Sequence, residues 1–458
     1  MTTAAPRAAR PRAVSRPMPR FAPVTRAVLP ASSLWPVILP SLSGQIGRAA
    51  PVADRPFGGD IFPTWCEARM ALAFRSGAGM AYRRFTSVDQ VIETLHPSYP
   101  ILCVHPDRLA RSANVFLKGF PGRVLYAVKC NPHPLVIQSL WRAGIRHFDT
   151  ASLNEIALVK ELLPEAECYF NHPVKGMAAI EAADRIYEMG AWVVDTVDEL
   201  DKIEEEVGKF PDVVQVRLQT ASGYAAFDLS LKFGATRDEA VALLQDVAAR
   251  GYVPAISFHV GSQCRTPEAW SRAIHDAREV MQRAGVPIRF LNVGGGFPAH
   301  YRGTQIPPLD AFFAAIKQAV AKLDLPEGCE LMCEPGRALV VEGCTLLVQV
   351  HLRKGASLYI NDGIYGNLSE LNIGKLTPPV RLIRRGDRPS SRDFAPFRIF
   401  GPTCDSLDVL PEPFVLPDDV TDGDWIEIGQ VGAYSNALAS PFNGFYTDTV
   451  VEIGDDPA

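Results

Sequence analysis

The stretch VLYAVKCN, residues 124–131, places a single lysine, Lys129, at the end of a run of apolar residues. A short run rich in β-branched and aromatic residues is typical of a buried strand. An amine held at the carboxyl end of such a strand, among apolar neighbours, loses its proton more easily than in water and attacks carbonyl groups. Lys129 is therefore our first candidate for a catalytic residue, although a strand-end lysine taken alone more often has a structural or surface role.

This strand is the first of eight similar units that follow residue 106. Each unit has a short β-branched run, a few polar or glycine residues and then a helical pattern, as in ATRDEAVALLQDVAARG at residues 235–251. Eight such units predict a (β/α)8 TIM barrel, because an open doubly wound sheet, the alternative, rarely reaches eight regular units. The predicted strands are residues 124–130, 147–152, 168–173, 191–195, 213–220, 255–262, 289–297 and 330–336.

The pattern differs on both sides of the predicted barrel, which spans residues 106–338. Residues 339–458 read as short strands separated by Gly, Pro and Asp, which predicts an all-β domain, a sandwich or a barrel. Residues 81–105 contain the strand-like ILCV and are expected to join that sheet. Residues 1–80 are rich in Arg, Pro and Ala, and no acidic residue precedes Asp54. We expect a disordered extension there; a transit peptide and an internal start at Met80 are the alternatives.

The composition restricts the class of partner. The chain has 458 residues, 47% of them hydrophobic, and a formal net charge of -5, which gives no field for nucleic acid. No stretch approaches the roughly 18 apolar residues of a membrane-spanning helix. The nine cysteines are an odd number without a CxxC pair, so we expect neither a disulfide framework nor a metal site, and a cytoplasmic protein with a small-molecule partner.

In a (β/α)8 barrel the reactive groups lie at the carboxyl ends of the strands. A lysine, two histidines, two arginines and three acids at the ends of the predicted strands together indicate an active site, although strands commonly end in polar turn residues. In chain order these positions hold Lys129, Asp149, His172, Asp195, Arg217, His259, Ser262, Gly294, Gly295, Gly296, Glu334 and Arg337.

The last two strand ends favour a phosphate site. Three consecutive glycines in GGGFP let backbone N–H groups approach an anion, and Arg337 of EPGR follows the neighbouring strand. A plain flexible turn is the alternative for the glycines, and an ion pair with an arginine is the alternative for Glu334. A lysine for an imine, a phosphate cradle and a carboxylate for a ring nitrogen match the requirements of pyridoxal 5'-phosphate.

These motifs, in this order, resemble the ornithine/diaminopimelate/arginine decarboxylase family of pyridoxal-phosphate enzymes, in which an alanine-racemase-like barrel is joined to a β domain. The resemblance runs from about residue 81 to residue 445, and CDS after GPT is similar to the ornithine branch. It is carried by YAVKCN, FDTAS with Glu155, LSLKFG, SFHVGSQ, GGGFP, EPGR, NDGIYG, GPTCDSLD and GAYSNALASPFNGF.

The resemblance implies roles for individual residues. Lys129 would bind the cofactor aldehyde, His259 would stack on the ring, Glu334 would bond the ring nitrogen, and Cys404 would be the proton donor. Asp405 would accept the distal ammonium of the substrate, and the β domain would supply Cys404 and Asp405 across a homodimer interface. Asp149 and Glu155 would support the lysine and Arg217 the ring; Ser262, Gly294, Gly295, Gly296, Gly336, Arg337 and Tyr434 would hold the phosphate; Tyr365, Glu370 and Phe442 would complete the substrate site.

The implied reaction is the decarboxylation of a basic amino acid, with L-ornithine giving putrescine and CO2 in polyamine biosynthesis. One departure concerns the substrate: Gly374 stands where eukaryotic-type ornithine decarboxylases carry a second aspartate, and Glu370 is the acid that would replace it. A lysine, diaminopimelate or carboxynorspermidine decarboxylase is therefore the alternative. A non-catalytic binding homologue would have lost the lysine or cysteine, and a racemase would lack GPTCDSLD.

Overall fold

The computed structural model describes residues 82–207, 212–220, 225–227, 232–323, 325, 327–384, 386 and 388–454, with the backbone alone for 225–227. Three points of the sequence analysis concern residues outside these ranges: the expected disorder of residues 1–80, the alternative start at Met80 and part of the LSLKFG motif. In the described part of the chain, no helix has the length and the apolar character needed to cross a bilayer.

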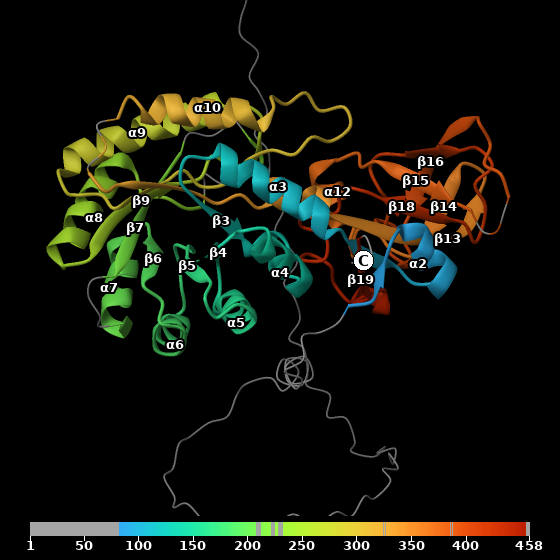
Figure 1. Cartoon of the computed structure of the whole chain (residues 1–458), viewed down its shortest axis with the longest axis horizontal. Helices are drawn as coiled ribbons and strands as arrows, with labels where there is room; N and C mark the ends of the chain where they lie inside the picture. Colours follow the sequence, from blue (N-terminus) through green and yellow to red (C-terminus); the bar gives the residue numbers. More distant parts are fainter. Residues whose placement is uncertain are drawn as a thin grey trace, which may run out of the picture. The chain divides into compact units, whose positions relative to one another are not determined.

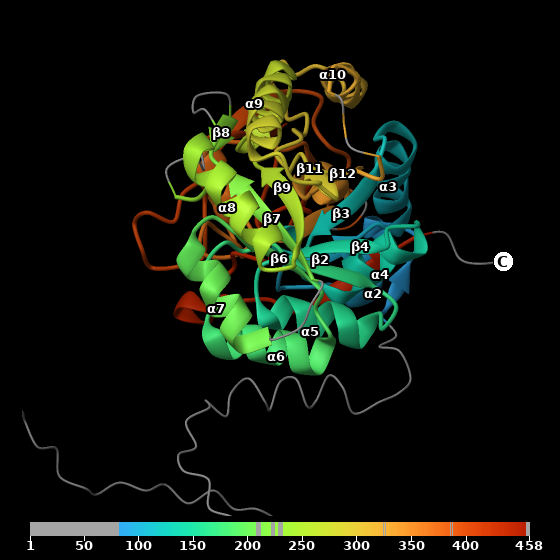
Figure 2. The ribbon, with the colours of Figure 1, turned by 90° about the vertical axis from the view of Figure 1, so that its left-hand side faces the viewer.

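Eight parallel strands close into a barrel, which confirms the predicted fold class (Figure 2). Each strand pairs in parallel with the next barrel strand along the chain, and β12 closes the ring by pairing with β3. The interiors of these strands are buried and largely apolar, as expected for parallel strands covered by helices. The strands are β3 (Arg123–Ala127), β4 (His147–Thr150), β5 (Glu167–Phe170), β6 (Ala191–Val194), β7 (Val213–Leu218), β9 (Val253–Phe258), β11 (Phe290–Asn292) and β12 (Glu330–Cys333).

Helices surround the strands (Figure 2). The predicted helix at residues 235–251 is α8 (Arg237–Ala249), which begins where Thr236 and Glu239 form a reciprocal capping box. The helix after β12, α11 (Arg337–Val340), is only one turn long, and α3 (Pro106–Gly119), which precedes β3, packs against it. The remaining helices are α4 (Pro134–Arg142), α5 (Leu153–Leu162), α6 (Met177–Tyr187), α7 (Val197–Val207), α9 (Glu268–Ala284) and α10 (Leu309–Val320).

All eight predicted barrel strands end earlier than expected, and two of these differences affect residues of the predicted site. Strand β3 ends at Ala127, and Lys129 lies in the 3-10 turn η1 (Val128–Cys130) that follows it. Strand β11 ends at Asn292, because Gly294 and Gly296 have φ of 67° and 98°, which a strand cannot include. Placing Ser262 at the end of a barrel strand was also wrong. It lies in β10 (Ser262–Cys264), which forms a separate antiparallel pair with β8 (Ala225–Phe227).

The second part of the fold is a mostly stranded domain built from both sides of the barrel in the sequence. Strand β2 (Ile101–Val104) pairs with β13 (Cys344–Lys354) and with β19 (Val450–Ile453), while α2 (Val88–Leu95) packs on the same sheet (Figure 1). We propose that residues 81–105 and 339–458 form this domain. Its other elements are β1 (Arg84–Phe85), η2 (Val341–Gly343), β14 (Ser357–Ile360), α12 (Ser369–Gly374), β15 (Val380–Ile383), β16 (Phe394–Phe400), β17 (Phe414–Pro417), β18 (Trp425–Ile428) and η3 (Phe442–Gly444).

Candidate active site

Lys129 meets a carboxylate at the barrel mouth. Its Nζ lies 2.6 Å from Oδ2 of Asp149, which is buried at the end of β4. Burial favours the neutral amine, but the negative charges of Asp149 and Glu334 outweigh it and raise the pKa of Lys129 above its usual value. The sequence argument for a lysine that readily loses its proton was therefore wrong for the free chain. It considered the apolar neighbours of Lys129 and did not count the charges of Asp149 and Glu334, although it placed both acids at the same rim.

Glu334 follows β12 and is held by side-chain amides. Its Oε1 accepts hydrogen bonds from Nδ2 of Asn171 at 2.8 Å and from Nδ2 of Asn292 at 2.7 Å. Gln215 of β7 joins the two, since it donates to Asn171 and accepts from Asn292, both at 3.0 Å. Burial and the nearby charge of Asp149 raise the pKa of Glu334 to about 7.

The sequence analysis missed this amide network. Gln215 is a polar residue within the apolar run VVQV, and Asn171 and Asn292 each lie inside a predicted strand. A buried polar side chain inside a barrel strand points toward the barrel axis, where a site can use it. That signal was present in the sequence.

His259 is an uncharged ring at the mouth. Burial, together with the positive charges of Arg217 and Lys129, lowers the pKa of His259 well below its usual value. Its Nδ1 accepts the backbone N–H of Gly261 at 3.0 Å, so in the neutral ring the proton resides on Nε2. Arg217 lies with its Cζ 5.3 Å from the ring of Phe233, and Phe233 also meets the ring of His172 edge to face. His172 and Arg217 thus belong to one side of the mouth.

The glycine loop after β11 leaves no room for side chains. A Cβ on Gly294 would lie 2.0 Å from the carbonyl oxygen of Phe258, and one on Gly296 would lie 2.2 Å from that of Gly261. A Cβ on Gly295 would come within 3.0 Å of Nε2 of His259. The loop therefore requires glycine for close backbone approach next to the histidine ring, in line with the sequence argument for a cradle.

Arg337 is buried at the start of α11, with Gly336 as the preceding cap. Its Nη1 donates to the hydroxyl of Tyr301 at 3.1 Å, and its Nη2 is bonded to Oε1 of Glu370. The ring of Tyr434 lies 5.1 Å from its Cζ, and the N–H of Tyr434 donates to the carbonyl of Cys130. The structure thus places Glu370 beside Arg337, whereas the sequence analysis placed it with the substrate residues.

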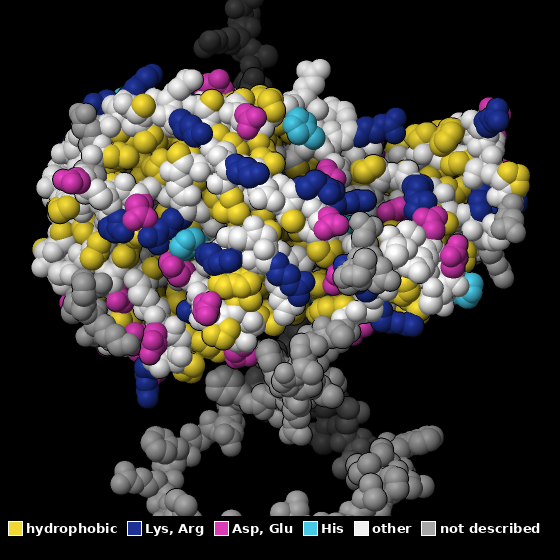
Figure 3. Space-filling model, in the orientation of Figure 1, with side chains coloured by type: hydrophobic (Ala, Val, Ile, Leu, Met, Phe, Trp, Pro, Cys, Tyr) yellow, Lys and Arg dark blue, Asp and Glu magenta, His cyan; other side chains and the backbone are white. Residues whose placement is uncertain are grey.

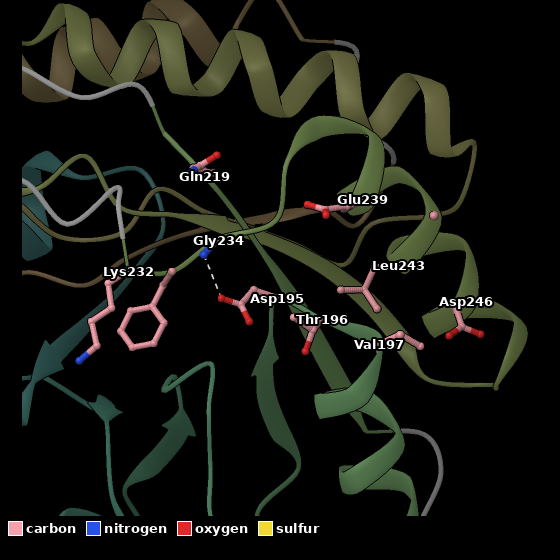
Figure 4. A pocket seen from close by; sticks show the side chains of 11 residues that line it. Asp195, Thr196, Val197, Gln219, Lys232, Gly234, Glu239, Leu243 and Asp246 are labelled. Atoms are coloured by element: carbon pink, nitrogen blue, oxygen red, sulfur yellow. Dashed lines mark hydrogen bonds between the residues drawn. The ribbon is translucent and has the colours of Figure 1, made fainter.

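Two acids of the predicted set have local partners. Glu155 of α5 accepts the backbone N–H of Ala151 at 2.7 Å, and burial raises its pKa. Asp195 accepts the N–H of Gly234 at 2.9 Å and lines a cavity of about 540 Å³ beside the mouth (Figure 4). The Glu239 carboxylate of this cavity is already used in the cap of α8. Among the described residues, Lys129, Glu334 and Arg337 do not line this cavity.

The remaining predicted residues form an exposed cluster on the β domain. The hydroxyl of Tyr365 donates to Oδ2 of Asp405 at 2.5 Å, and the ring of Tyr365 lies 4.7 Å from that of Phe442. The thiol and the N–H of Cys404 both point to Oδ1 of Asn443, at 3.3 Å. Exposed apolar side chains of the same segments are Leu407, Leu438, Phe442, Phe445 and Tyr446. Figure 3 shows one face of the molecule, on which apolar and charged side chains are interspersed.

The structure thus separates the predicted residues into two groups. One is the barrel-mouth group around Lys129, Glu334 and Arg337. The other is the β-domain group of Cys404, Asp405, Tyr365 and Phe442, whose contacts lie within the β domain. Among the described residues, no cluster of His, Cys, Asp and Glu has an arrangement that suits a metal ion.

Comparison with known proteins shows the family of the chain. Residues 107–341 match the family model described as pyridoxal-dependent decarboxylase, pyridoxal binding domain. Decarboxylase flvG of Aspergillus flavus is 34% identical over 356 residues, which cover 73% of this chain and 80% of that protein. The lysine/ornithine decarboxylase of Selenomonas ruminantium is 31% identical over 78% of this chain and 90% of its own length. The ornithine decarboxylase of Schizosaccharomyces pombe is 33% identical over 72% and 78%.

Solved structures show the same likeness. The arginine decarboxylase of Paramecium bursaria Chlorella virus superposes with a TM-score of 0.72 at 28% identity, covering 80% of this chain and 99% of that chain. The lysine/ornithine decarboxylase of Vibrio vulnificus, solved with putrescine, gives a TM-score of 0.69 at 30% identity over 80% and 97%.

Proposed function

Because this chain belongs to the family of pyridoxal-dependent decarboxylases, we propose that it decarboxylates L-ornithine to putrescine and CO2. The observation that carries the choice of a basic substrate is the position of Asp405 beside Cys404. The N–H of Leu407 and the hydroxyl of Tyr365 both donate to Asp405 and lower the pKa of its carboxyl. An ionised carboxylate of fixed orientation is suited to bind the distal ammonium of a diamino acid.

The barrel-mouth group fits pyridoxal phosphate. Glu334 is a half-buried carboxyl whose pKa is raised by desolvation and by the charge of Asp149. A protonated ring nitrogen would supply the positive charge that its ionised form lacks. Lys129 would hold the aldehyde carbon, and neutral His259 would lie against the ring. We propose that Arg337, Tyr434, Ser262 and the glycines 294–296 and 336 hold the phosphate, with Arg217 beside the ring.

When bound, the cofactor supplies a ring that accepts the electron pair released as the carboxylate leaves the substrate. The chain's own residues control the protons. Glu334 would keep a proton on the ring nitrogen, Asp149 and Glu155 would orient Lys129, and the thiol of Cys404 would give its proton to the former α-carbon. The bond from Cys404 to Asn443 shows that this thiol is oriented by a neighbour.

We further propose that Cys404, Asp405, Tyr365 and Phe442 act at the barrel mouth of a second copy in a homodimer. All four are exposed or half-buried, and apolar side chains such as Leu407 and Phe445 surround them without cover. Exposed apolar residues grouped with functional side chains are typical of an interface.

Lysine is the second candidate substrate. Gly374 ends α12 where an aspartate would add a second ligand for the distal amine, and Glu370 is engaged with Arg337. A site with a single acid for the distal amine places fewer constraints on the length of the substrate side chain, which favours lysine as the second candidate.

The test is to incubate the purified protein and pyridoxal phosphate with ornithine, lysine, arginine and meso-diaminopimelate, and to identify the amine by mass spectrometry. Putrescine formed with the highest kcat/KM supports the proposal, and cadaverine would support the second candidate. Release of CO2 from none of these amino acids would overturn both.

A further inference from the structure

Arg337 is buried and contacts side chains from three other segments of the chain. Its side chain is 4% exposed, and that of Glu370 is 9% exposed. Tyr301, from the loop after β11, bonds one terminal nitrogen, and Glu370, from α12, bonds the other. Tyr434 stacks its ring on the guanidinium from a third segment. Three segments that are distant in sequence therefore fix one guanidinium group.

The contact with Glu370 has two physical consequences. A buried guanidinium needs a counter-charge when no anion is bound, and Glu370 supplies it. Arginine has a long, flexible side chain, so a bond to one edge of its fork restricts where the other edge can point. Cys130, Tyr301 and Tyr434 are among the electrostatic neighbours of this pair.

We propose that Glu370 is a positioning residue, which holds the guanidinium of Arg337 ready for the phosphate group of the cofactor and thereby links helix α12 to the phosphate site. The inference rests on the proposed assignment of Arg337 to the phosphate. It gives Glu370 a role other than binding the substrate amine. Helix α12 begins four residues after Tyr365, so the link would connect the phosphate side of the site with the loop that carries Tyr365 and contacts Asp405.

The test compares pyridoxal phosphate with pyridoxal, which has the aldehyde but no phosphate. Dissociation constants of both are measured on the apoprotein by absorbance, for wild type, Glu370→Ala and Glu370→Gln. We expect Glu370→Ala to weaken binding of pyridoxal phosphate about tenfold or more, with pyridoxal unchanged. Glu370→Gln should stay within about threefold of wild type, because its amide oxygen still accepts a bond from Arg337.

A matched control removes another buried ion pair. Glu199 contacts Lys175 at 2.8 Å, and the two side chains are 4% and 0% exposed. Glu199→Ala should lower the melting temperature while both dissociation constants remain at the wild-type values. If Glu370→Ala weakens both ligands equally, or weakens neither, the positioning role is wrong. If only KM for the amino acid rises, Glu370 is a substrate ligand instead.

If Glu370→Ala does not fold, the Glu370→Gln variant and amide hydrogen exchange of wild type test the positioning role of Glu370. Addition of pyridoxal phosphate to wild type should slow amide exchange in residues 369–374, and addition of pyridoxal should not. Equal protection by both ligands would contradict the link between the phosphate and α12. These measurements use no turnover, so they remain readable even if the substrate screen shows that the proposed reaction is wrong.

Discussion

At the residue scale, Lys129, Asp149 and Glu334 share one small volume, and their charges determine one another. Asp149 is 1% exposed, and its Oδ2 lies 2.6 Å from Nζ of Lys129. Glu334 is a second carboxylate near the same ammonium. The positive charge of Lys129 only partly offsets desolvation and the repulsion from Asp149, so the pKa of Glu334 is raised. The free chain therefore keeps its lysine protonated, and it is Glu334 that titrates near neutral pH.

The first prediction concerns the stability of the apoprotein as pH changes. The folded chain raises the pKa of Glu334 from 4.5 to about 7, so between these values the folded state binds a proton that the unfolded state has lost. Stability from this group is therefore complete below about pH 4.5 and declines as pH rises to 7, by roughly 3 kcal/mol. The urea midpoint of wild type should fall from pH 5 to pH 8 more than that of Glu334→Gln. Exposed Glu165→Gln is the control, and equal slopes for Glu334→Gln and wild type would contradict the prediction.

The second prediction concerns the cofactor bond. Lys129→Ala should remove the visible absorption that an imine of pyridoxal phosphate gives, because the amine that faces the mouth is lost. Spectra are recorded after reconstitution and dialysis. Lys232→Ala, which removes an exposed lysine next to the mouth, should keep the band. A band that survives in Lys129→Ala would place the covalent bond on another amine.

At the scale of elements, the ends of the strands determine the chemistry. The glycine loop after β11 passes so close to β9 that the carbonyl of Phe258 occupies the place of a side chain on Gly294. The loop therefore holds the ends of two neighbouring strands at a fixed distance. In the proposed site, its backbone faces the phosphate.

The third prediction uses this loop. Gly294→Ala combines a φ of 67° with a contact at 2.0 Å, so the loop must move, and pyridoxal phosphate should bind at least tenfold more weakly. Gly303→Ala is the matched control, because its φ of 81° is also positive but no atom lies within 4 Å of the added Cβ. It should lose about 1 kcal/mol of stability and bind normally. The dissociation constant for pyridoxal phosphate and the urea midpoint are measured for both variants. Normal binding by Gly294→Ala would contradict the role of this loop in the phosphate site.

Much of this arrangement could be predicted from the sequence, because parallel buried strands are continuous apolar runs and their ends are marked by polar residues. The prediction failed where local geometry decides. A run of apolar residues does not show that β3 turns into a 3-10 helix before Lys129, or that Ser262 leaves the barrel after Gly261. The bond from Arg337 to Glu370 joins residues of different domains, and neither hydrophobic period nor spacing contains that information.

At the scale of the whole molecule, the proposed site is divided between two surfaces. The amine, the ring carboxylate and the guanidinium lie at the barrel mouth, while the thiol and the substrate acid lie on the exposed face of the β domain. A homodimer in which each β domain faces the other barrel would bring the two groups together twice.

The fourth prediction follows from that division. Chains with Lys129→Ala and chains with Cys404→Ala should each be nearly inactive. Mixed and reassembled, they should recover about a quarter of wild-type activity, since half of the dimers then contain one intact site out of two. Lys129→Ala mixed with Glu334→Gln should recover nothing, because both changes affect the same barrel. Activity is measured after dissociation and reassociation, and no recovery in the first mixture would show that each site is built from one chain.

Strand β2 bears on how the chain folds during synthesis. Its partners β13 and β19 leave the ribosome more than two hundred residues later, after every strand of the barrel. The apolar segment ILCV therefore remains without its strand partners while the ribosome translates the barrel. An unpaired apolar strand is prone to aggregation. We expect this short segment to be where chaperones bind the nascent chain, and where premature termination before residue 450 leads to aggregation.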